Sequence, residues 1–127
     1  MARRTAANVT RGFIALAPIR TAAKTGSRAG VTVAALLAEV EALAPPALAE
    51  PWDRVGLQVG DPRAIVSRVM TCLELSEPTL AEARRRRAQA VVAHHPLFFR
   101  PLEALDLSRR VGRLAAGLVR SEIALIA

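Results

Sequence analysis

VMTCLELSEPTLAEARRRRAQAVVAHHP, residues 69–96, has the pattern of a strand, a helix and a second strand in succession. The segment Ile65–Leu75 is rich in β-branched residues, and its middle is apolar on both faces, as in a strand inside a covered sheet. Ser76 is a suitable N-cap for a helix from about residue 77 to residue 88. Ala90–Ala93 follows as a second buried strand. The 14 residues between the two strands suffice for a helical crossover, so the stretch predicts a βαβ unit with parallel strands.

A helix and a long loop are expected before this unit. Thr32 is a suitable N-cap, and apolar residues recur behind it at helical spacing until Pro45 and Pro46 end the helix. Residues 47–62 contain two glycines and a final proline, which predict an ordered loop or a short edge strand. The apolar stripe of the helix consists of Val33, Leu36, Leu37, Val40 and Leu43.

Another helix and another strand are expected after the unit. Asp106 or Ser108 is the predicted N-cap of this helix. Ile123–Ala127 then begins a third buried strand, which we expect to form an unprotected sheet edge. The alternation of helix and strand predicts an α/β fold with a largely parallel sheet and a βαβ crossover. The apolar stripe of the helix consists of Val111, Leu114, Ala115, Leu118 and Val119.

Positive charge is concentrated in the first part of the chain. The 127 residues carry a net charge of +7, and residues 1–31 contribute +6 of it without a single acid. Their composition fits three interpretations, namely a disordered basic tail, a segment upstream of a true start near Val31 or Val33, or a mitochondrial-type presequence. We therefore divide the chain into a leader, residues 1–31, and an α/β domain, residues 32–127. The domain is nearly neutral, so its charge gives no indication of a nucleic-acid partner.

The composition excludes several further classes of protein and of binding site. Cys72 is the single cysteine, which excludes an internal disulfide or a CxxC metal pair and fits a reducing compartment. Three Phe and one Trp are too few for a surface on which single-stranded nucleic acid stacks. No apolar run approaches the roughly 18 residues that span a bilayer. We expect a soluble, cytoplasmic protein without a membrane partner.

His94 and His95 are the pair with the clearest chemical capacity, because they follow a buried strand and precede Pro96. The carboxyl ends of parallel strands are the usual ligand-binding edge of an α/β sheet. Neighbouring side chains of an extended segment point to opposite sides, so each imidazole could serve one of two ions, or only one could be a ligand. A pair of loop histidines without metal is the alternative. Glu74 and Asp53 are candidate carboxylates at the edge of such a site, with a polar strand end and a loop-fixing turn as their alternative roles.

The run Arg84–Arg87 suggests a competing function, since four guanidinium groups could contact the phosphates of an acidic partner. Consecutive helical residues fan around the axis by about 100° each, so the run does not form one flat stripe. Cations in a last helical turn also complement the helix dipole. A solvated helix end is therefore the favoured interpretation. The alternative is a non-catalytic interaction module that binds acidic partners through this cluster.

Four segments form a recognisable combination: Thr32-Val33, Leu43–Pro46, Trp52–Pro62 and Ala93–Phe99. Together they resemble the amino-terminal part of the NIF-three-like dinuclear metal-centre family, whose members are often described as GTP cyclohydrolase I type 2 homologues. The likeness runs from about residue 31 to Ala127. It implies an α/β metal-binding protein in which His94 and His95 are ligands of a site with two divalent ions, zinc, iron or manganese. It further implies metal-assisted hydrolysis of a small substrate such as a nucleotide, and assembly into hexamers.

The sequence departs from the family pattern at three positions. Arg54 stands where Asn is usual, Glu74 where the strand tends to end in Asp, and Ala93 where Thr is common. The resemblance also implies an acidic ligand after the strand Ile123–Ala127, and a further His and Glu near the family's carboxyl terminus, for which this sequence has no counterpart. We therefore expect a fragment with an incomplete dinuclear site that binds metal weakly and is inactive alone. No catalytic residue is assigned.

Overall fold

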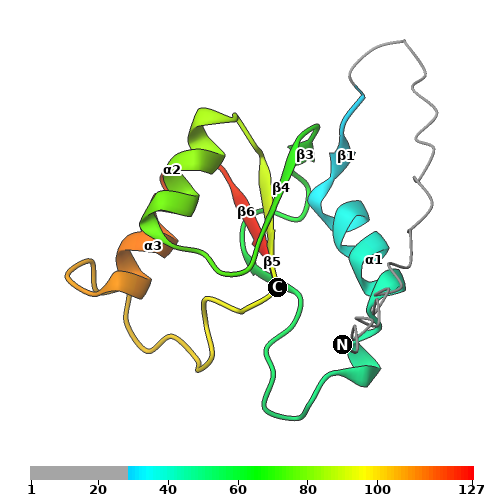
Figure 1. The fold of residues 1–127 in the computed structure, drawn as a ribbon, viewed down its shortest axis with the longest axis horizontal. Coiled ribbons are helices and arrows are strands. Elements are labelled where there is room, and N and C mark those ends of the chain that lie inside the picture. Colours follow the sequence, from blue (N-terminus) through cyan, green and yellow to red (C-terminus); the bar gives the residue numbers. More distant parts are fainter. Residues whose placement is uncertain (1–28) are drawn as a thin grey trace, which may run out of the picture.

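The computed structural model describes residues 29–127, so the predictions for residues 1–28 of the leader lie outside the described chain. Residues 29–127 form two β-sheets, of which the larger has four strands in the order β2-β6-β5-β4 and the smaller pairs β1 with β3 (Figure 1). Among residues 29–127, no helix combines the length and apolarity needed to cross a membrane. The elements are β1 (Val31–Thr32), α1 (Val33–Leu43), the 3₁₀ turn η1 (Pro46–Leu48), β2 (Leu57–Val59), β3 (Ile65–Val66), β4 (Val69–Cys72), α2 (Glu77–Arg85), β5 (Ala90–Ala93), α3 (Arg110–Arg120) and β6 (Ala124–Ile126).

The predicted βαβ unit and α/β fold are confirmed. β4 and β5 run parallel and in register over their full length, with α2 as the crossover between them. The hydroxyl of Ser76 caps α2 by accepting a hydrogen bond from Thr79 N at 3.2 Å. The helix ends at Arg85, earlier than residue 88, because the backbone turns into the left-handed region at Arg87, where φ is 54°.

The predicted long strand Ile65–Leu75 is two strands, β3 and β4, which belong to different sheets. The break lies at Ser67 and Arg68. Both backbone amides donate to Gln89 Oε1, at 3.1 and 2.9 Å, so a side chain replaces a neighbouring strand at this point. Pairing with a side chain lets the backbone leave one sheet and enter the other without losing its hydrogen bonds.

β6 lies in the interior of the large sheet. It pairs in parallel with β5 and antiparallel with β2, so two of the three strand pairs in this sheet are parallel. Gly56 and Ala127 extend the β2–β6 pairing by exchanging backbone hydrogen bonds of 2.7 and 3.0 Å. The prediction that Ile123–Ala127 forms an unprotected edge is therefore wrong. β2 covers it, which confirms a short edge strand within residues 47–62.

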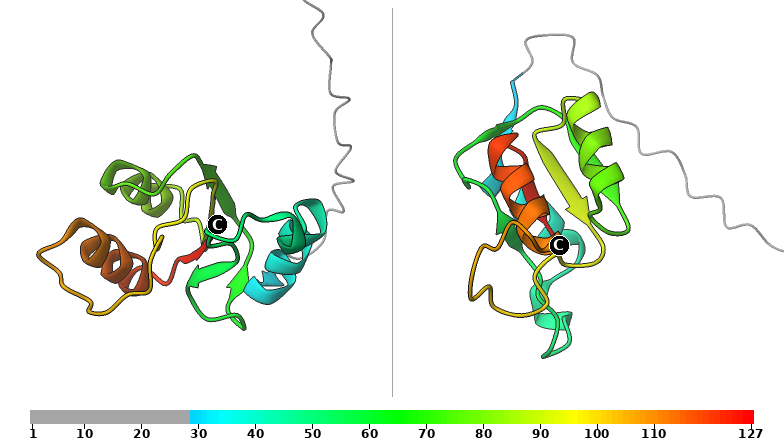
Figure 2. Two further views of the ribbon diagram at one scale, coloured as in Figure 1. Left: turned by 90° about the horizontal axis from the view of Figure 1, so that it is seen from below. Right: turned by 90° about the vertical axis from the view of Figure 1, so that its left-hand side faces the viewer.

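Two helices, α2 and α3, cover one face of the large sheet and enclose the main hydrophobic core (Figures 1 and 2). Leu125 of β6 is fully buried there with Leu80 of α2 and with Leu114 and Leu118 of α3. This confirms most of the predicted α3 stripe. Val119 does not belong to it and is 64% exposed, because one residue beyond Leu118 the helix surface has rotated toward solvent.

The predicted side-chain cap of α3 is wrong. The N-cap position is Arg109, which makes no capping side-chain bond. The carboxylate of Asp106 instead closes the preceding turn, where its Oδ1 accepts from Ser108 N and Oγ at 2.9 and 2.7 Å. These hydrogen bonds are the main cause that lowers the pKa of the Asp106 carboxyl. The cap is lost because the acid is already engaged within its own loop.

The opposite face of the sheet carries α1 and a smaller core, to which Val33 and Val66 contribute (Figure 2). Thr32 caps α1, as predicted, by accepting a 3.1 Å hydrogen bond from an amide of the first turn. The predicted stripe of α1 is only partly covered, and Leu43 is 88% exposed. Val31, which the sequence analysis assigned to the leader, pairs with Val66 in the small sheet.

Candidate metal centre

His94 and His95 lie at the carboxyl end of β5, at the sheet edge where the sequence predicts a site. Their backbone amides donate to the carbonyls of Cys72 and Leu73, at 3.0 and 2.8 Å. These two bonds continue the β4–β5 ladder beyond the strands. Pro96, which has no amide hydrogen, is buried directly after them. The backbone beneath both imidazoles is therefore held by two neighbouring strands.

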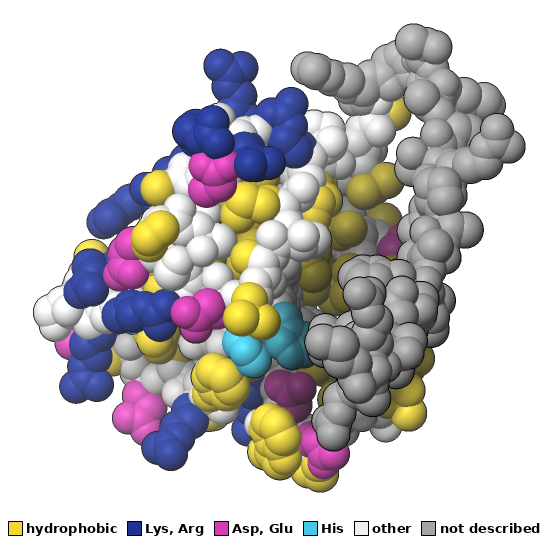
Figure 3. Space-filling model, in the orientation of Figure 1, with side chains coloured by type: hydrophobic (Ala, Val, Ile, Leu, Met, Phe, Trp, Pro, Cys, Tyr) yellow, Lys and Arg dark blue, Asp and Glu magenta, His cyan; other side chains and the backbone are white. Residues whose placement is uncertain are grey.

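The two imidazole rings are neighbours. Their centroids lie 4.8 Å apart and their planes are tilted by 56°. Both side chains are exposed, and Figure 3 shows them in cyan, side by side on one face of the molecule. The expectation that they point to opposite sides is wrong. Strand alternation ends with β5 at Ala93, and the chain bends at both histidines.

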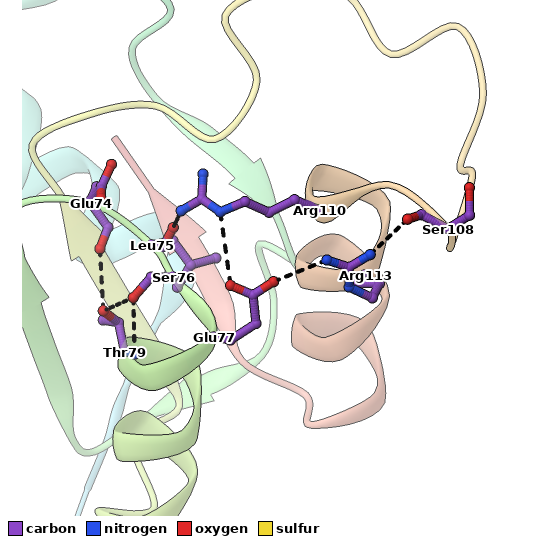
Figure 4. A network of polar contacts seen from close by, with 8 residues as sticks. All are labelled: Glu74, Leu75, Ser76, Glu77, Thr79, Ser108, Arg110 and Arg113. Atoms are coloured by element: carbon purple, nitrogen blue, oxygen red, sulfur yellow. Dashed lines mark hydrogen bonds and ion pairs between the residues drawn. The ribbon is translucent and has the colours of Figure 1, made fainter.

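The backbone of Glu74–Ser76 is fixed at the entrance to α2. Thr79 Oγ1 donates to the Glu74 carbonyl at 3.4 Å, and Arg110 Nη2 donates to the Leu75 carbonyl at 3.0 Å. Arg110 and Arg113 of α3 also pair with the carboxylate of Glu77, at 3.8 and 3.4 Å. Figure 4 shows the Glu74 side chain directed away from this network. The contacts hold the strand end in place and leave the Glu74 carboxylate outside them.

Asp53 shares a cleft with His94. The cleft measures about 440 Å³ and lies between α1 and the carboxyl ends of the strands. Asp53 Oδ1 also accepts from Arg54 N at 2.8 Å, which is the loop-fixing role considered for it. Cys72 lines the same cleft, but burial, and then the nearby Glu74 charge, raise the pKa of its thiol.

The structure thus brings together part of the predicted donor set. His94 lies beside His95 and shares its cleft with Asp53, whereas His95 and Glu74 are outside the cleft lining. Within residues 29–127, no group of three or more His, Cys, Asp or Glu side chains is arranged to hold a metal ion. The described chain offers two adjacent imidazoles, one of which shares a cleft with a carboxylate.

Gln58 is a residue of this region that sequence reasoning missed. Its Oε1 accepts from the backbone amides of Leu97 and Phe98, at 2.7 and 3.0 Å, and its Nε2 donates to the Arg54 carbonyl at 3.0 Å. One side chain thus ties the loop after the histidines to the loop before β2. The sequence feature that could have drawn attention to Gln58 is its position as a polar residue between the apolar Leu57 and Val59 of an edge strand.

The arginine run of α2 is engaged within the molecule. Arg84 Nε and Nη2 donate to Ser121 Oγ and the Gly117 carbonyl, at 2.7 and 3.1 Å, and tie α2 to α3. Arg85 and Arg86 both pair with Glu82, at 2.6 and 2.5 Å. These contacts agree with a helix end as the role of Arg84, Arg85 and Arg86.

Curated proteins similar to this chain include a GTP cyclohydrolase 1 type 2 homolog of Lactococcus lactis, which is 41% identical over 86 residues. That match covers 68% of this chain and 34% of the relative. A NIF3-like protein 1 of Drosophila melanogaster is 33% identical over 97 residues, or 76% of this chain and 33% of the relative. The chain therefore spans about a third of the length of these relatives.

Solved structures show the same fold. Protein SA1388 of Staphylococcus aureus superposes with a TM-score of 0.73 at 31% identity, over 76% of this chain and 31% of the other. A Bacillus cereus protein related to NIF3 superposes with a TM-score of 0.72 at 30% identity, over 76% and 27%. The Duf34/NIF3 (NGG1p interacting factor 3) family matches residues 31–127. The family resemblance drawn from the sequence is confirmed, and this chain belongs to the Duf34/NIF3 family.

Proposed function

We propose that His94 and His95 are ligands of divalent metal at the carboxyl end of the sheet, within a protein that binds metal. The observation that carries the proposal is the adjacency of two exposed imidazoles on a backbone fixed by β4 and β5. Imidazole nitrogen suits zinc and iron, and a nearby carboxylate such as Asp53 widens the choice to manganese. Adjacent rings also leave both possibilities open, one shared ion or one ion for each ring.

The described residues supply only part of the ligand set that a metal site needs. A structural or catalytic site of a first-row metal takes three or four protein ligands, and residues 29–127 cluster fewer. The proposal therefore requires donors in addition to the two histidines. With these two alone, we expect weak, reversible binding rather than a closed site.

The activity of the whole protein is a further proposal, because the chain spans about a third of relatives named GTP cyclohydrolase 1 type 2 homolog. Metal at such a site supplies Lewis acidity and an activated water, which suits hydrolysis of a small substrate such as a nucleotide. This chain contributes the imidazoles, the backbone that fixes them and the Gln58 clamp on the loop behind them. We place this hydrolysis in the cytoplasm, where nucleotides are available as substrates.

Metal binding by the purified chain tests the proposal directly. Isothermal titration with Zn²⁺ and Mn²⁺, together with the visible absorption of added Co²⁺, should show binding that the double variant His94→Ala/His95→Ala loses. We expect the affinity for Zn²⁺ to fall by about tenfold or more, because loss of a group that merely supports a metal ligand already weakens metal binding about 10- to 100-fold.

Glu103→Ala is the matched control, since it removes an exposed carboxylate that lines a different cleft from His94. It should bind as the unaltered chain does. Equal metal uptake by the double variant and the unaltered chain would reject the ligand assignment. Ring resonances of both histidines, followed by NMR during the titration, distinguish ligation from binding elsewhere.

A further inference from the structure

A cleft of about 320 Å³ lies between two loops next to the candidate metal centre. One wall is drawn from residues 54–58, which lead into β2, and the other from residues 98–102, which follow the histidines. Both loops run past the C-terminus, at the carboxyl end of β5 (Figures 1 and 2). Val55 also lines the cleft of His94 and Asp53, so the two clefts are neighbours.

The cleft carries positive charge. Arg54 lines one wall and Arg100 the other, and no Asp or Glu is among the described residues that line it. Neither arginine belongs to an ion pair within residues 29–127. Two cations without a neutralising carboxylate favour an anionic ligand.

A larger cleft of about 890 Å³ shares the loop 98–102 with this one, but its other arginines are neutralised. Arg109 pairs there with Asp106 at 3.3 Å. Arg110 pairs with Glu77 at 3.8 Å. The smaller cleft is therefore the better site for an anion.

The backbone that carries the two arginines of the smaller cleft is fixed. Arg54 N donates to Asp53 Oδ1 at 2.8 Å, and the Arg54 carbonyl accepts from Gln58 Nε2 at 3.0 Å. Gln58 Oε1 accepts from Phe98 N, also at 3.0 Å, two residues before Arg100. One side chain thus joins the two walls and fixes their spacing. A site that is rigid before binding loses less conformational entropy when a ligand binds.

The rest of the lining is largely apolar. Val55 and Leu102 are 48% and 46% exposed, and Phe98 is half-buried. Apolar groups beside unpaired cations suit a ligand with an anionic group and a flat ring, because the ring packs against an aromatic side chain. A volume of about 320 Å³ lies at the small end of the range for ligand pockets, so the cleft suits one ring rather than a polymer.

We propose that this cleft binds a phosphate monoester of an aromatic compound, with the phosphate between Arg54 and Arg100 and the ring against Phe98. The paired N–H groups of a guanidinium match the oxygens of a phosphate, which makes arginine well suited to bind it. The inference rests on the proposed function only in taking this ligand as the substrate of the metal centre, and binding itself needs no metal. Arg54 is a departure from the family pattern, so the charge of the cleft is a property of this sequence.

Binding of phenyl phosphate to the full chain tests the proposal. Isothermal titration in EDTA gives the dissociation constant without metal. Arg54→Gln and Arg100→Gln each remove one cation and should weaken binding by about fivefold or more, because charge-assisted hydrogen bonds are lost. The variant with both changes should show no saturable binding. Inorganic phosphate should bind about tenfold more weakly than phenyl phosphate, since it lacks the ring.

Arg120→Gln is the matched control. Arg120 is exposed in the last turn of α3, which ends where β6 begins, at the sheet edge opposite the histidines. The variant should bind phenyl phosphate as the unaltered chain does, and circular dichroism checks that every variant is folded.

Three results would overturn the proposal. The first is no binding of phenyl phosphate by the unaltered chain, and the second is an affinity that Arg54→Gln and Arg100→Gln leave unchanged. The third is an equal loss of affinity in Arg120→Gln. Equal affinity for inorganic phosphate and phenyl phosphate would reject the aromatic part of the ligand.

The double variant His94→Ala/His95→Ala separates this inference from the proposed metal site. It should bind phenyl phosphate in EDTA as the unaltered chain does. An unaltered chain that binds Zn²⁺ but no phenyl phosphate contradicts the inference about the cleft alone. An unaltered chain that binds phenyl phosphate but no Zn²⁺ supports the cleft and contradicts the assignment of the metal ligands.

Discussion

The two faces of the large sheet are covered unequally. Among residues 29–127, twelve buried residues form one core beneath α2 and α3, whereas four buried residues form the core under α1. On the α1 side, Leu43, Leu48 and Trp52 are 88%, 81% and 68% exposed. Apolar burial is the main favourable contribution to folding, so most of the stability must come from the α2–α3 side. The cleft that holds His94 and Asp53 opens on the other, weakly packed side.

Truncation of a leucine on each side should give the largest contrast. Leu118→Ala on the α2–α3 side should lower the free energy of unfolding by about 3 kcal/mol, because it leaves a cavity in the core. Leu43→Ala on the α1 side should change it by no more than about 0.5 kcal/mol, because the side chain is almost fully exposed. Urea unfolding followed by circular dichroism measures both.

Val119→Ala is the matched control for Leu118→Ala, since the two residues are neighbours on α3 and Val119 is exposed. It should behave like Leu43→Ala. Similar losses for Leu118→Ala and Leu43→Ala would mean that α1 is covered in solution and that the contrast between the two faces is wrong.

A middle-sized effect is expected at Gln58, which ties the loop after the histidines to the loop before β2. Gln58→Ala removes the acceptor of the Leu97 and Phe98 amides and should cost about 1–2 kcal/mol. Hydrogen exchange of these two amides should accelerate more than exchange in β5. Gln58→Glu keeps acceptor oxygens in place and should retain much of their protection. Unchanged exchange in Gln58→Ala would show that the loop behind the histidines is held by other contacts.

The smallest effect concerns the surface of the α2–α3 side. Hydrogen bonds from Arg85 and Arg86 lower the pKa of Glu82 from 4.5 to about 2. A carboxyl whose pKa is lower in the folded state contributes stability above its unfolded pKa and loses it as the pH falls toward the folded value. The free energy of unfolding is measured between about pH 5 and pH 2. It should depend less on pH in Glu82→Gln than in the unaltered chain. Glu103→Gln, a loop carboxyl, is the control. An identical pH dependence for Glu82→Gln and the unaltered chain would contradict the pairing.

The local parts of the fold could be predicted from sequence. Thr32 and Ser76 cap their helices because an N-cap depends on bonds within one turn. The central place of β6 could not be predicted, since it depends on pairing with β2, whose partner residues Leu57 and Ile126 lie far apart in the chain. Asp106 failed as a cap for a local reason, because the turn before the helix competes for the same carboxylate.

The sequence predicts where the candidate site lies in the fold, but it does not predict how the side chains of the site are oriented. The position of His94 and His95 follows from strand order, which a βαβ pattern specifies. Their relative orientation depends on the bend after Ala93, and one residue of difference in where a strand ends reverses the direction of a side chain. The clamp by Gln58 joins residues about 40 positions apart, so no local pattern reveals it.

The interior position of β6 also bears on how the chain folds as it is synthesised. β6 leaves the ribosome after all the other strands of its sheet, yet both β2 and β5 need it as a neighbour. Until it emerges, β2 has no partner strand, while the β4–α2–β5 unit can already pair. One edge of β5 thus stays unpaired while residues 94–126 are synthesised, which is when chaperones protect such surfaces from aggregation.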